Sequence, residues 1–402
     1  MAHGGKVIAV TNLNDSGPGS LRAAVETPGP RTVIFRISGT IELAKPLRVV
    51  HPYLTIAGQT APGDGICLKS YSLQIGGTHD IVVRYLRCRP GDKTSQPGEM
   101  DAISIWDVKD VVIDHCSATW STDECLSVTL AADRVTVQHC LIAEGLTKHS
   151  YGSIIGSYDG ALSFLHNLYA NNISRNPRPG GYQSLPDHKQ DAGPRIEFRS
   201  NVISNWGWGP GYTGSGYHEE PEHIAMNYIG NYLKAGPDSK ESGRAFTIHN
   251  GARAELFLAG NQCDPTVPLQ NQSELLRLLP GCTVILRDVP LPFEPSTAQT
   301  LSAASAYAEV LANVGAVKPK RDLVDAQIIE GVRDGTGRQK LTIADDAWPL
   351  LRGGNSEPDV DADGLPDAWE QTHGLNPNDP TDAARTTGDE GWTHLELWLN
   401  NQ

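Results

Sequence analysis

Short runs of alternating apolar and polar residues recur along the chain, and each is followed by a small or polar residue and a second short run. This alternation has the two-residue period of a β-strand. The residues between the paired runs are spaced by 30, 24, 27, 34, 30 and 30 positions; they are Leu86, Cys116, Cys140, Asn167, Asn201, Asn231 and Asn261. A repeat near this period, with loops of variable length, is typical of a solenoid.

The column of four asparagines indicates a parallel β-helix, and the fold class that we expect is an all-β, right-handed parallel β-helix. Asparagine tolerates left-handed backbone geometry at a tight bend, and its amide can bond to the amide one rung away. Residues 32–43 and 53–61 resemble earlier rungs. An antiparallel β-sandwich with asparagine turns is the alternative, but a sandwich rarely keeps one period across seven copies.

Helical patterns are expected at both ends of the repeats. An exposed first rung needs a cap, and residues 19–26 predict a short capping helix with Ser20 as N-cap and Pro28 as its stop. Residues 303–314 and 322–332 predict two helices that pack on the solenoid exterior. We therefore expect a β-helix domain at 1–352, including a helical extension at about 297–345, followed by a small helix and loop module at 353–402.

Charge divides unevenly between these parts. The 402 residues carry 33 Lys and Arg against 47 Asp and Glu, a net charge of −14. The last 48 residues hold eleven acids and one Arg, so they account for −10 and the first 354 residues for −4. An excess of acid argues against a duplex nucleic-acid partner. No apolar run approaches the ~18 residues of a membrane span, so we expect no membrane partner.

Seven cysteines give an odd count. Most of them lie in apolar strand-like runs, which favours small buried side chains over metal ligands. Cys263 and Cys282 lie in loop-like sequence and are candidates for a disulfide in an exported protein.

The acidic tail contains the sharpest local motif, DVDADGLPDAWE at 359–370. Calcium takes six to eight oxygens, and acids at loop positions 1, 3, 5, 9 and 12 with Gly364 at position 6 match that need. The predicted ligands of this structural calcium are Asp359, Asp361, Asp363, the Leu365 carbonyl, Asp367 and Glu370. The loop resembles the thrombospondin type 3 and EF-hand-like calcium repeats of extracellular proteins. Candidates for a second ion are Asp379, Asp382 and Asp389.

The repeats themselves resemble the pectate lyases of polysaccharide lyase family 1. The similarity covers roughly residues 5–345, and its most specific part is R-N-P-R after H-N. The motifs that carry it are DAISI (101–105), VVIDHCS (111–117), STDECLSV (121–128), IIGSYDG (154–160) and HNLYANNISRNPR (166–178). The resemblance implies a calcium-dependent enzyme that cleaves α-1,4-linked polygalacturonate by β-elimination.

The resemblance also implies an acidic calcium pocket. Asp101 and Asp123 would hold the catalytic calcium, but the family's third carboxylate falls near Ser127. Glu124 is the compensating candidate. Strand alternation puts Asp123 and Ser127 on one face, so Glu124 turns outward only if the strand begins at Cys125. Glu99, two residues before Asp101, is a further candidate ligand.

Basic residues next to the calcium complete the implied site. Arg175 occupies the family's base position, and a guanidinium base implies activity that rises on the alkaline side. Arg178 would bind a substrate carboxylate as a fork, and Lys148 the carboxylate of the leaving sugar. Gly180 stands where the family often has another Arg, so that contact is missing or comes from Lys189 or Arg195.

Two rival functions remain at this stage. A pectin lyase acts on methyl-esterified polymer without calcium, which the acids at 101 and 123 argue against. A catalytically silent β-helix that binds carbohydrate is favoured only by positions 127 and 180, where this chain departs from the residue pattern of the family. The leading prediction is therefore a secreted, monomeric pectate lyase that uses calcium and acts on polygalacturonate, with its signal peptide removed.

Overall fold

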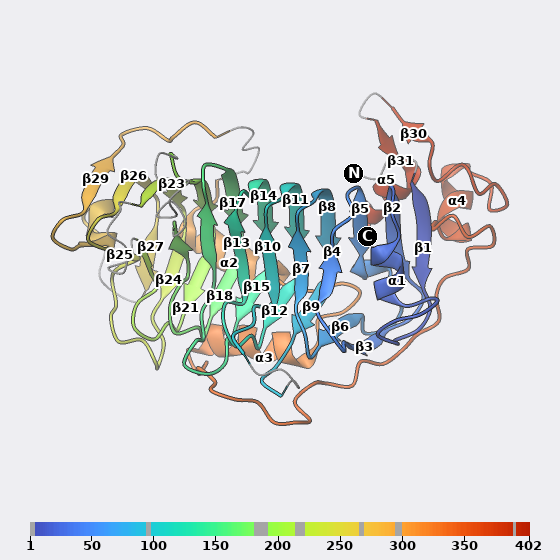
Figure 1. Ribbon diagram of the computed structural model, residues 1–402, viewed down its shortest axis with the longest axis horizontal. Coiled ribbons are helices and arrows are strands. Elements are labelled where there is room, and N and C mark those ends of the chain that lie inside the picture. Colours follow the sequence, from blue (N-terminus) through green and yellow to red (C-terminus); the bar gives the residue numbers. More distant parts are fainter. Residues whose placement is uncertain are drawn as a thin grey trace.

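The computed structural model describes residues 5–93, 98–180, 192–213, 222–264, 269–293, 300–388 and 391–402. The chain winds into an elongated parallel β-solenoid whose strands stack along its long axis (Figure 1). The predicted parallel solenoid is therefore confirmed.

Three long sheets run along the solenoid, and neighbouring strands in each of them are parallel. The first has eleven strands: β1 (Lys6–Val10), β2 (Arg31–Phe35), β5 (Leu54–Ala57), β8 (His79–Arg84), β11 (Lys109–Asp114), β14 (Asp133–Gln138), β17 (Ala161–Leu165), β20 (Arg195–Arg199), β23 (His223–Ile229), β26 (Arg253–Ala259) and β29 (Thr283–Leu286). The second has nine: β3 (Gly39–Glu42), β6 (Ile66–Lys69), β9 (Leu86–Arg89), β12 (Ser117–Thr119), β15 (Leu141–Ala143), β18 (Leu168–Ala170), β21 (Val202–Ser204), β24 (Tyr232–Lys234) and β27 (Gln262–Asp264).

The third sheet is shorter and carries the residues of interest. Its six strands are β4 (Leu47–Val49), β7 (Leu73–Gly76), β10 (Ile103–Trp106), β13 (Leu126–Leu130), β16 (Ile154–Ser157) and β19 (Arg178–Pro179). A three-stranded parallel sheet is formed by β22 (Gly211–Thr213), β25 (Phe246–Ile248) and β28 (Leu276–Leu278). Two short 3-10 helices, η1 (Gly58–Thr60) and η3 (Gln272–Leu275), complete the turns.

Alternate residues of each strand fill the solenoid interior. In the first sheet Val111 pairs in register with Val135, and Val135 pairs with Leu162. All three are at most 1 % exposed, as are Ile196, Met226 and Leu256 further along the same column. A column of apolar side chains along the axis buries each rung against the next, which is the source of stability in a solenoid.

The asparagine ladder predicted from the sequence is present. Asn167 Nδ2 donates to Asn201 Oδ1 at 3.0 Å, Asn201 to Asn231 at 3.2 Å and Asn231 to Asn261 at 3.0 Å. The left-handed backbone, however, belongs to the residue before the ladder position. His166 and Ser200, for example, have φ of 55° and 54°. The asparagine contributes its hydrogen bonds and its neighbour makes the bend, so that part of the expectation was wrong.

The residues at this bend stack outside the interior. The ring centroids of His115 and His139 are 4.6 Å apart and those of His139 and His166 are 5.0 Å apart, and Tyr85 stacks on His115. Glu309 bonds to His166 Nδ1 at 3.1 Å. These histidines lie between the first and second sheets, where they support the rungs.

Helices cover one end and one side of the solenoid. The helix α1 (Leu21–Glu26) is capped by Ser20, whose Oγ accepts from Ala23 N, and its apolar face joins the main core. The helices α2 (Ala303–Asn313) and α3 (Leu323–Asp334) pack on the outer face of the second sheet. Within the described residues, no helix combines the length and apolar character needed to cross a bilayer.

The C-terminal segment returns to the start of the solenoid. It contains α4 (Asp367–His373), the antiparallel pair β30 (Thr386–Thr387) and β31 (Trp392–Thr393), and α5 (His394–Asn401). Leu365 and Trp398 form an apolar cluster with Ala57 of β5 and Val7 of β1. Figure 1 shows α4 and α5 beside β1 and β2, so residues more than 300 positions apart lie together.

Candidate active site

The residues that precede consecutive strands of the third sheet lie next to one another. Ile103 of β10 pairs with Leu126 of β13, which places Asp101 beside Glu124 two residues earlier. Glu124 then forms a parallel bridge to Tyr151, and Tyr151 forms one to Ser174. The turns before β10, β13, β16 and β19 thus present one row of side chains across four rungs.

Three carboxylates of this row come together. Asp101, Asp123 and Glu124 each offer an oxygen within 4.8 Å of the others. Burial, together with the charges of Glu124 and Asp123, raises the pKa of Asp101 well above its usual range. Burial and Glu124 raise the pKa of Asp123 to about 8. Each of these acids disfavours ionisation of the others. A bound cation is therefore needed for all three to be charged at the same time.

Glu124 belongs to this cluster because the strand begins late. Strand β13 starts at Leu126, and Cys125 and Leu126 are both fully buried in the core. The alternation extrapolated back from Ser127 therefore breaks at Cys125, and Glu124 turns toward Asp101. Ser127 is paired with Ser104 of β10 and adds no carboxylate.

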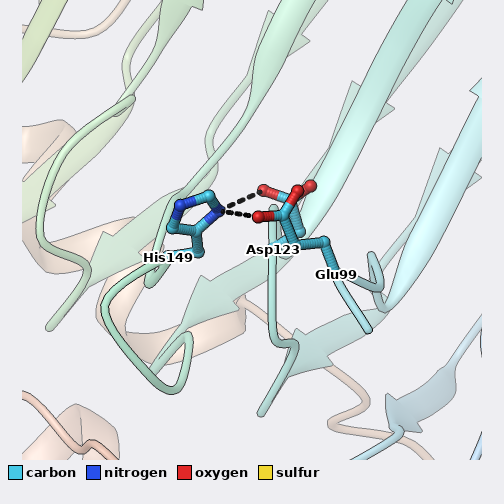
Figure 2. A group of neighbouring side chains, drawn as sticks. All are labelled: Glu99, Asp123 and His149. Atoms are coloured by element: carbon cyan, nitrogen blue, oxygen red, sulfur yellow. Dashed lines mark ion pairs between the residues drawn. The ribbon is translucent and has the colours of Figure 1, made fainter. Parts of the chain in front are cut away.

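A histidine that the sequence analysis did not single out faces the same acids. Figure 2 shows the His149 ring directed at Glu99 and Asp123. Its Nδ1 lies 2.9 Å from Glu99 Oε1 and 3.8 Å from Asp123 Oδ1. Lys148, next in the chain, is exposed and lines hollows on both sides of this loop, one of about 430 Å³ shared with Glu99.

Arg175 lies against the acid cluster between two tyrosines. Its Nη1 donates to Glu124 Oε1, and its Nε donates to the Tyr212 hydroxyl at 3.1 Å. The guanidinium carbon lies 3.9 Å from the centre of the Tyr151 ring. Burial alone would lower the pKa of Arg175, but Glu124 and Tyr212 outweigh it and raise the pKa above the usual value. These neighbours hold Arg175 as a guanidinium.

Arg178 is nearly buried beside them. It begins β19, is 8 % exposed, and its Nη2 lies 3.4 Å from Glu222 Oε1. A Cβ at Gly180 would lie 3.2 Å from both Glu222 Oε2 and a methyl of Ile224, and the backbone there has φ of +85°. An arginine does not fit at 180 for both reasons. Arg195 belongs to the first sheet, and Lys189 lies outside the described residues.

Curated relatives identify the family of this chain. No family model matches it. It is 36 % identical over 402 residues to "Probable pectate lyase C" of Neosartorya fischeri, and 37 % identical over 407 residues to the protein of that name in Aspergillus flavus. Each alignment covers 99 % of this chain and 89 % of the relative. The chain belongs to the pectate lyase family.

Solved structures show the fold that this family membership implies. The crystal structure of jun a 1, the major allergen from cedar pollen, matches with a TM-score of 0.58 at 16 % identity, covering 79 % of this chain and 90 % of that one. A pectate lyase bound to a hexasaccharide matches with a TM-score of 0.54 at 13 % identity, covering 77 % and 91 %. Membership in the pectate lyase family indicates a polysaccharide lyase.

A second acid cluster of this lyase lies in the C-terminal segment. Asp359, Asp361 and Asp363 offer oxygens within 4.8 Å of one another, and so do Asp363, Glu370 and Asp382. Burial and the neighbouring acids raise the pKa of Glu370 to about 7.

The other residues predicted for the tail calcium lie around this cluster. Leu365 is buried and its N–H donates to Asp363 Oδ1 at 2.9 Å, while Asp367 accepts from Val360 N at 2.9 Å in the first turn of α4. Asp379 pairs with Arg385, so it does not join the cluster. Asp389 lies outside the described residues.

Proposed function

We propose that this chain is a secreted, monomeric, calcium-dependent pectate lyase that cleaves α-1,4-linked polygalacturonate by β-elimination. The observation that carries the proposal is Arg175, a cation with partial access to solvent, placed directly against the cluster of Asp101, Asp123 and Glu124. A base next to a calcium site is the combination that this reaction needs, and family membership supplies the context.

The donor set fits calcium. It consists of carboxylate oxygens only, which is the ligand class that calcium prefers, and the acids repel one another in its absence. Asp101, Asp123 and Glu124 would hold the calcium, and the ion would supply Lewis-acid chemistry that withdraws charge from a uronate carboxylate and makes the proton at C5 more acidic.

Arginines supply the remaining roles in the proposal. Arg178, beside Arg175, pairs with a uronate carboxylate, and Arg175 removes the C5 proton. The electrons of the C5–H bond then form the C4–C5 double bond, the C4–O4 bond breaks, and the leaving sugar keeps that electron pair on its oxygen and takes a proton from water. Lys148, exposed at the hollow next to Glu99, is available to the carboxylate of the leaving sugar.

The contact between Glu124 and Arg175 strengthens the expectation that activity needs an alkaline pH. Glu124 stabilises the charged form of Arg175, and a protonated guanidinium cannot accept a proton. Glu124 would stabilise the guanidinium less if its carboxylate were engaged in holding calcium. Activity is therefore expected to need both calcium and an alkaline pH.

The tail loop is proposed to hold a structural calcium through Asp359, Asp361, Asp363, the Leu365 carbonyl, Asp367 and Glu370. The support is the loop spacing together with the approach of these acids in the fold. Loops of this kind bind calcium at the millimolar concentrations found outside cells.

The test follows the ultraviolet absorbance of 4,5-unsaturated ends released from polygalacturonate. Wild type is expected to release them with calcium and to stop with chelator, and Arg175→Ala to be inactive. Arg134→Ala removes an exposed arginine that pairs with Asp110 elsewhere and serves as the control. Full activity in Arg175→Ala refutes the base. Calcium-independent cleavage of methyl-esterified polymer indicates a pectin lyase, and binding without unsaturated ends indicates a silent β-helix.

A further inference from the structure

The acid cluster of the C-terminal segment contains buried carboxylate oxygens that have no hydrogen-bond partner among the described residues. Asp363, Glu370 and Asp382 are 5 %, 0 % and 1 % exposed. Both oxygens of Glu370 and Oδ1 of Asp382 are buried and form no hydrogen bond within the part of the chain that the structure describes. Unpaired buried charge is strongly unfavourable. Carboxylate oxygens that converge in this way fit a divalent cation.

Asp382 brings a second segment to the loop. It lies twelve positions beyond Glu370, so the loop spacing does not include it. Its Oδ2 accepts from Asn376 N at 3.0 Å, which fixes the turn that begins there. The next residue, Ala383, donates its N–H to Asp363 Oδ2 at 3.2 Å. The segment 376–383 is therefore held to the loop 359–370 at the acid cluster.

The same two segments contact the first turns of the solenoid. Leu365 and Ala383, each one or two residues from an acid of the cluster, pack in the apolar cluster that contains Ala57 and Val7. The Arg36 guanidinium, just after β2, bonds to Asp359 Oδ2. The backbone carbonyl of Leu399 in α5 accepts from Gln59 and from Arg84, at 3.2 Å each. The acid cluster thus lies at the junction between the two ends of the chain.

We propose that Asp382 completes the tail calcium site and that the bound calcium acts as a clasp, holding residues 359–388 and 391–401 over the first turns of the solenoid. This inference rests on the proposed calcium binding by the loop. Without the cation, the three buried carboxylates repel one another when they are ionised, and separation of segment 376–383 from the loop relieves that repulsion. That separation moves Ala383 and Leu365 away from β1, and β1 then becomes exposed to solvent on that side.

Hydrogen exchange of the full-length protein, with calcium and with chelator, tests the clasp. A ligand at about 100 times its Kd slows exchange through an opening that releases it by about a hundredfold. We expect slowing of up to that factor in peptides from β1 (Lys6–Val10) and α5 (His394–Asn401). Slowing confined to 359–370 overturns the clasp, because the cation then orders only its own loop.

Equilibrium dialysis with calcium alone tests the role of Asp382. Asp382→Asn is expected to bind one calcium fewer than wild type, or to bind it at least tenfold more weakly, and to lose the effect on β1. The matched control, Asp379→Asn, changes an acid of the same segment that faces Arg385 and is expected to match wild type.

The outcomes separate the two proposals. If wild type and Glu370→Gln bind the same number of calcium ions, the tail site itself is absent. If Glu370→Gln loses an ion and Asp382→Asn does not, the tail site stands and the assignment of Asp382 is wrong. The comparison of wild type with and without calcium needs no variant, so a folding defect in Asp382→Asn leaves the clasp testable.

Discussion

Tyr151 is the residue on which the guanidinium of Arg175 rests, and its ring is expected to set the position of the base. The guanidinium carbon lies 3.9 Å from the ring centre, Tyr151 is 8 % exposed, and the other fixed contacts of Arg175 are Glu124 and Tyr212. A cation over an aromatic ring gains about 0.5–1 kcal/mol when exposed and about 2 kcal/mol when desolvated. This site lies between those limits, so we expect Tyr151→Ala to forfeit about 1–2 kcal/mol.

If that contact positions Arg175 for proton transfer, the loss appears in kcat. At about 1.36 kcal/mol per factor of ten, the expected fall in kcat is roughly 5- to 30-fold. The assay is the rate of release of unsaturated ends at saturating polygalacturonate and calcium, with KM measured alongside. A positioning role predicts a fall in kcat with KM little changed.

The control for this prediction is Tyr151→Phe, which keeps the ring and removes only the hydroxyl. It is expected to stay within about twofold of wild type, because the ring face provides the cation–π attraction. A wild-type rate in Tyr151→Ala, or an equal fall in both variants, refutes the reasoning. In the first case the ring does not position Arg175, and in the second the hydroxyl does.

Two further predictions concern stability. Arg89 is fully buried and bonds to Asp322 and Asp325. Arg89→Met removes the cation paired with Asp325 and leaves Asp322 with Arg87 at 3.4 Å, so it is expected to cost about 3–5 kcal/mol in hydrogen-exchange stability of α3, whereas the exposed Arg333→Met costs under about 1 kcal/mol. Burial, with the charge of His115 next, lowers the pKa of His139 to about 4. The unfolded chain therefore binds this proton first, and stability falls as pH drops from about 6.5 to 4, by about 3 kcal/mol in all. Urea unfolding at pH 7 and pH 4 measures that loss, and His139→Phe should reduce it.

The solenoid could be predicted because its signals are local and repeated. Each rung carries its own alternation, and Asn167, Asn201, Asn231 and Asn261 mark the same bend at nearly constant spacing. Because the same pattern recurs in many rungs, a wrong assignment in any single rung does not change the predicted fold. Ser20 was predictable for the same local reason, since an N-cap acts within three residues of itself.

The candidate site was predictable only in part, because its contacts join residues from different turns. Glu124 reaches Asp101 because the strand begins at Leu126, and no alternation pattern gives the first residue of a strand. Tyr151 lies 24 positions before Arg175 and Tyr212, in β22, lies 37 positions after it, yet both flank its guanidinium. Only the register between turns places them there. Sequence spacing can identify charged residues as candidates for the site. It does not show which tyrosine rings pack against them.

The position of the tail changes what its charge means for the substrate. The segment carries −10, which looks unfavourable for an enzyme proposed to bind a polyanion. Asp359, however, bonds to Arg36 just after β2, whereas Glu124 precedes β13 on the turn of β14, four strands along the first sheet. At about 4.8 Å per strand this is a separation of about 19 Å, more than twice the Debye length of ~8 Å at physiological salt. The repulsion between the tail and a polyanion at the candidate active site is therefore mostly screened.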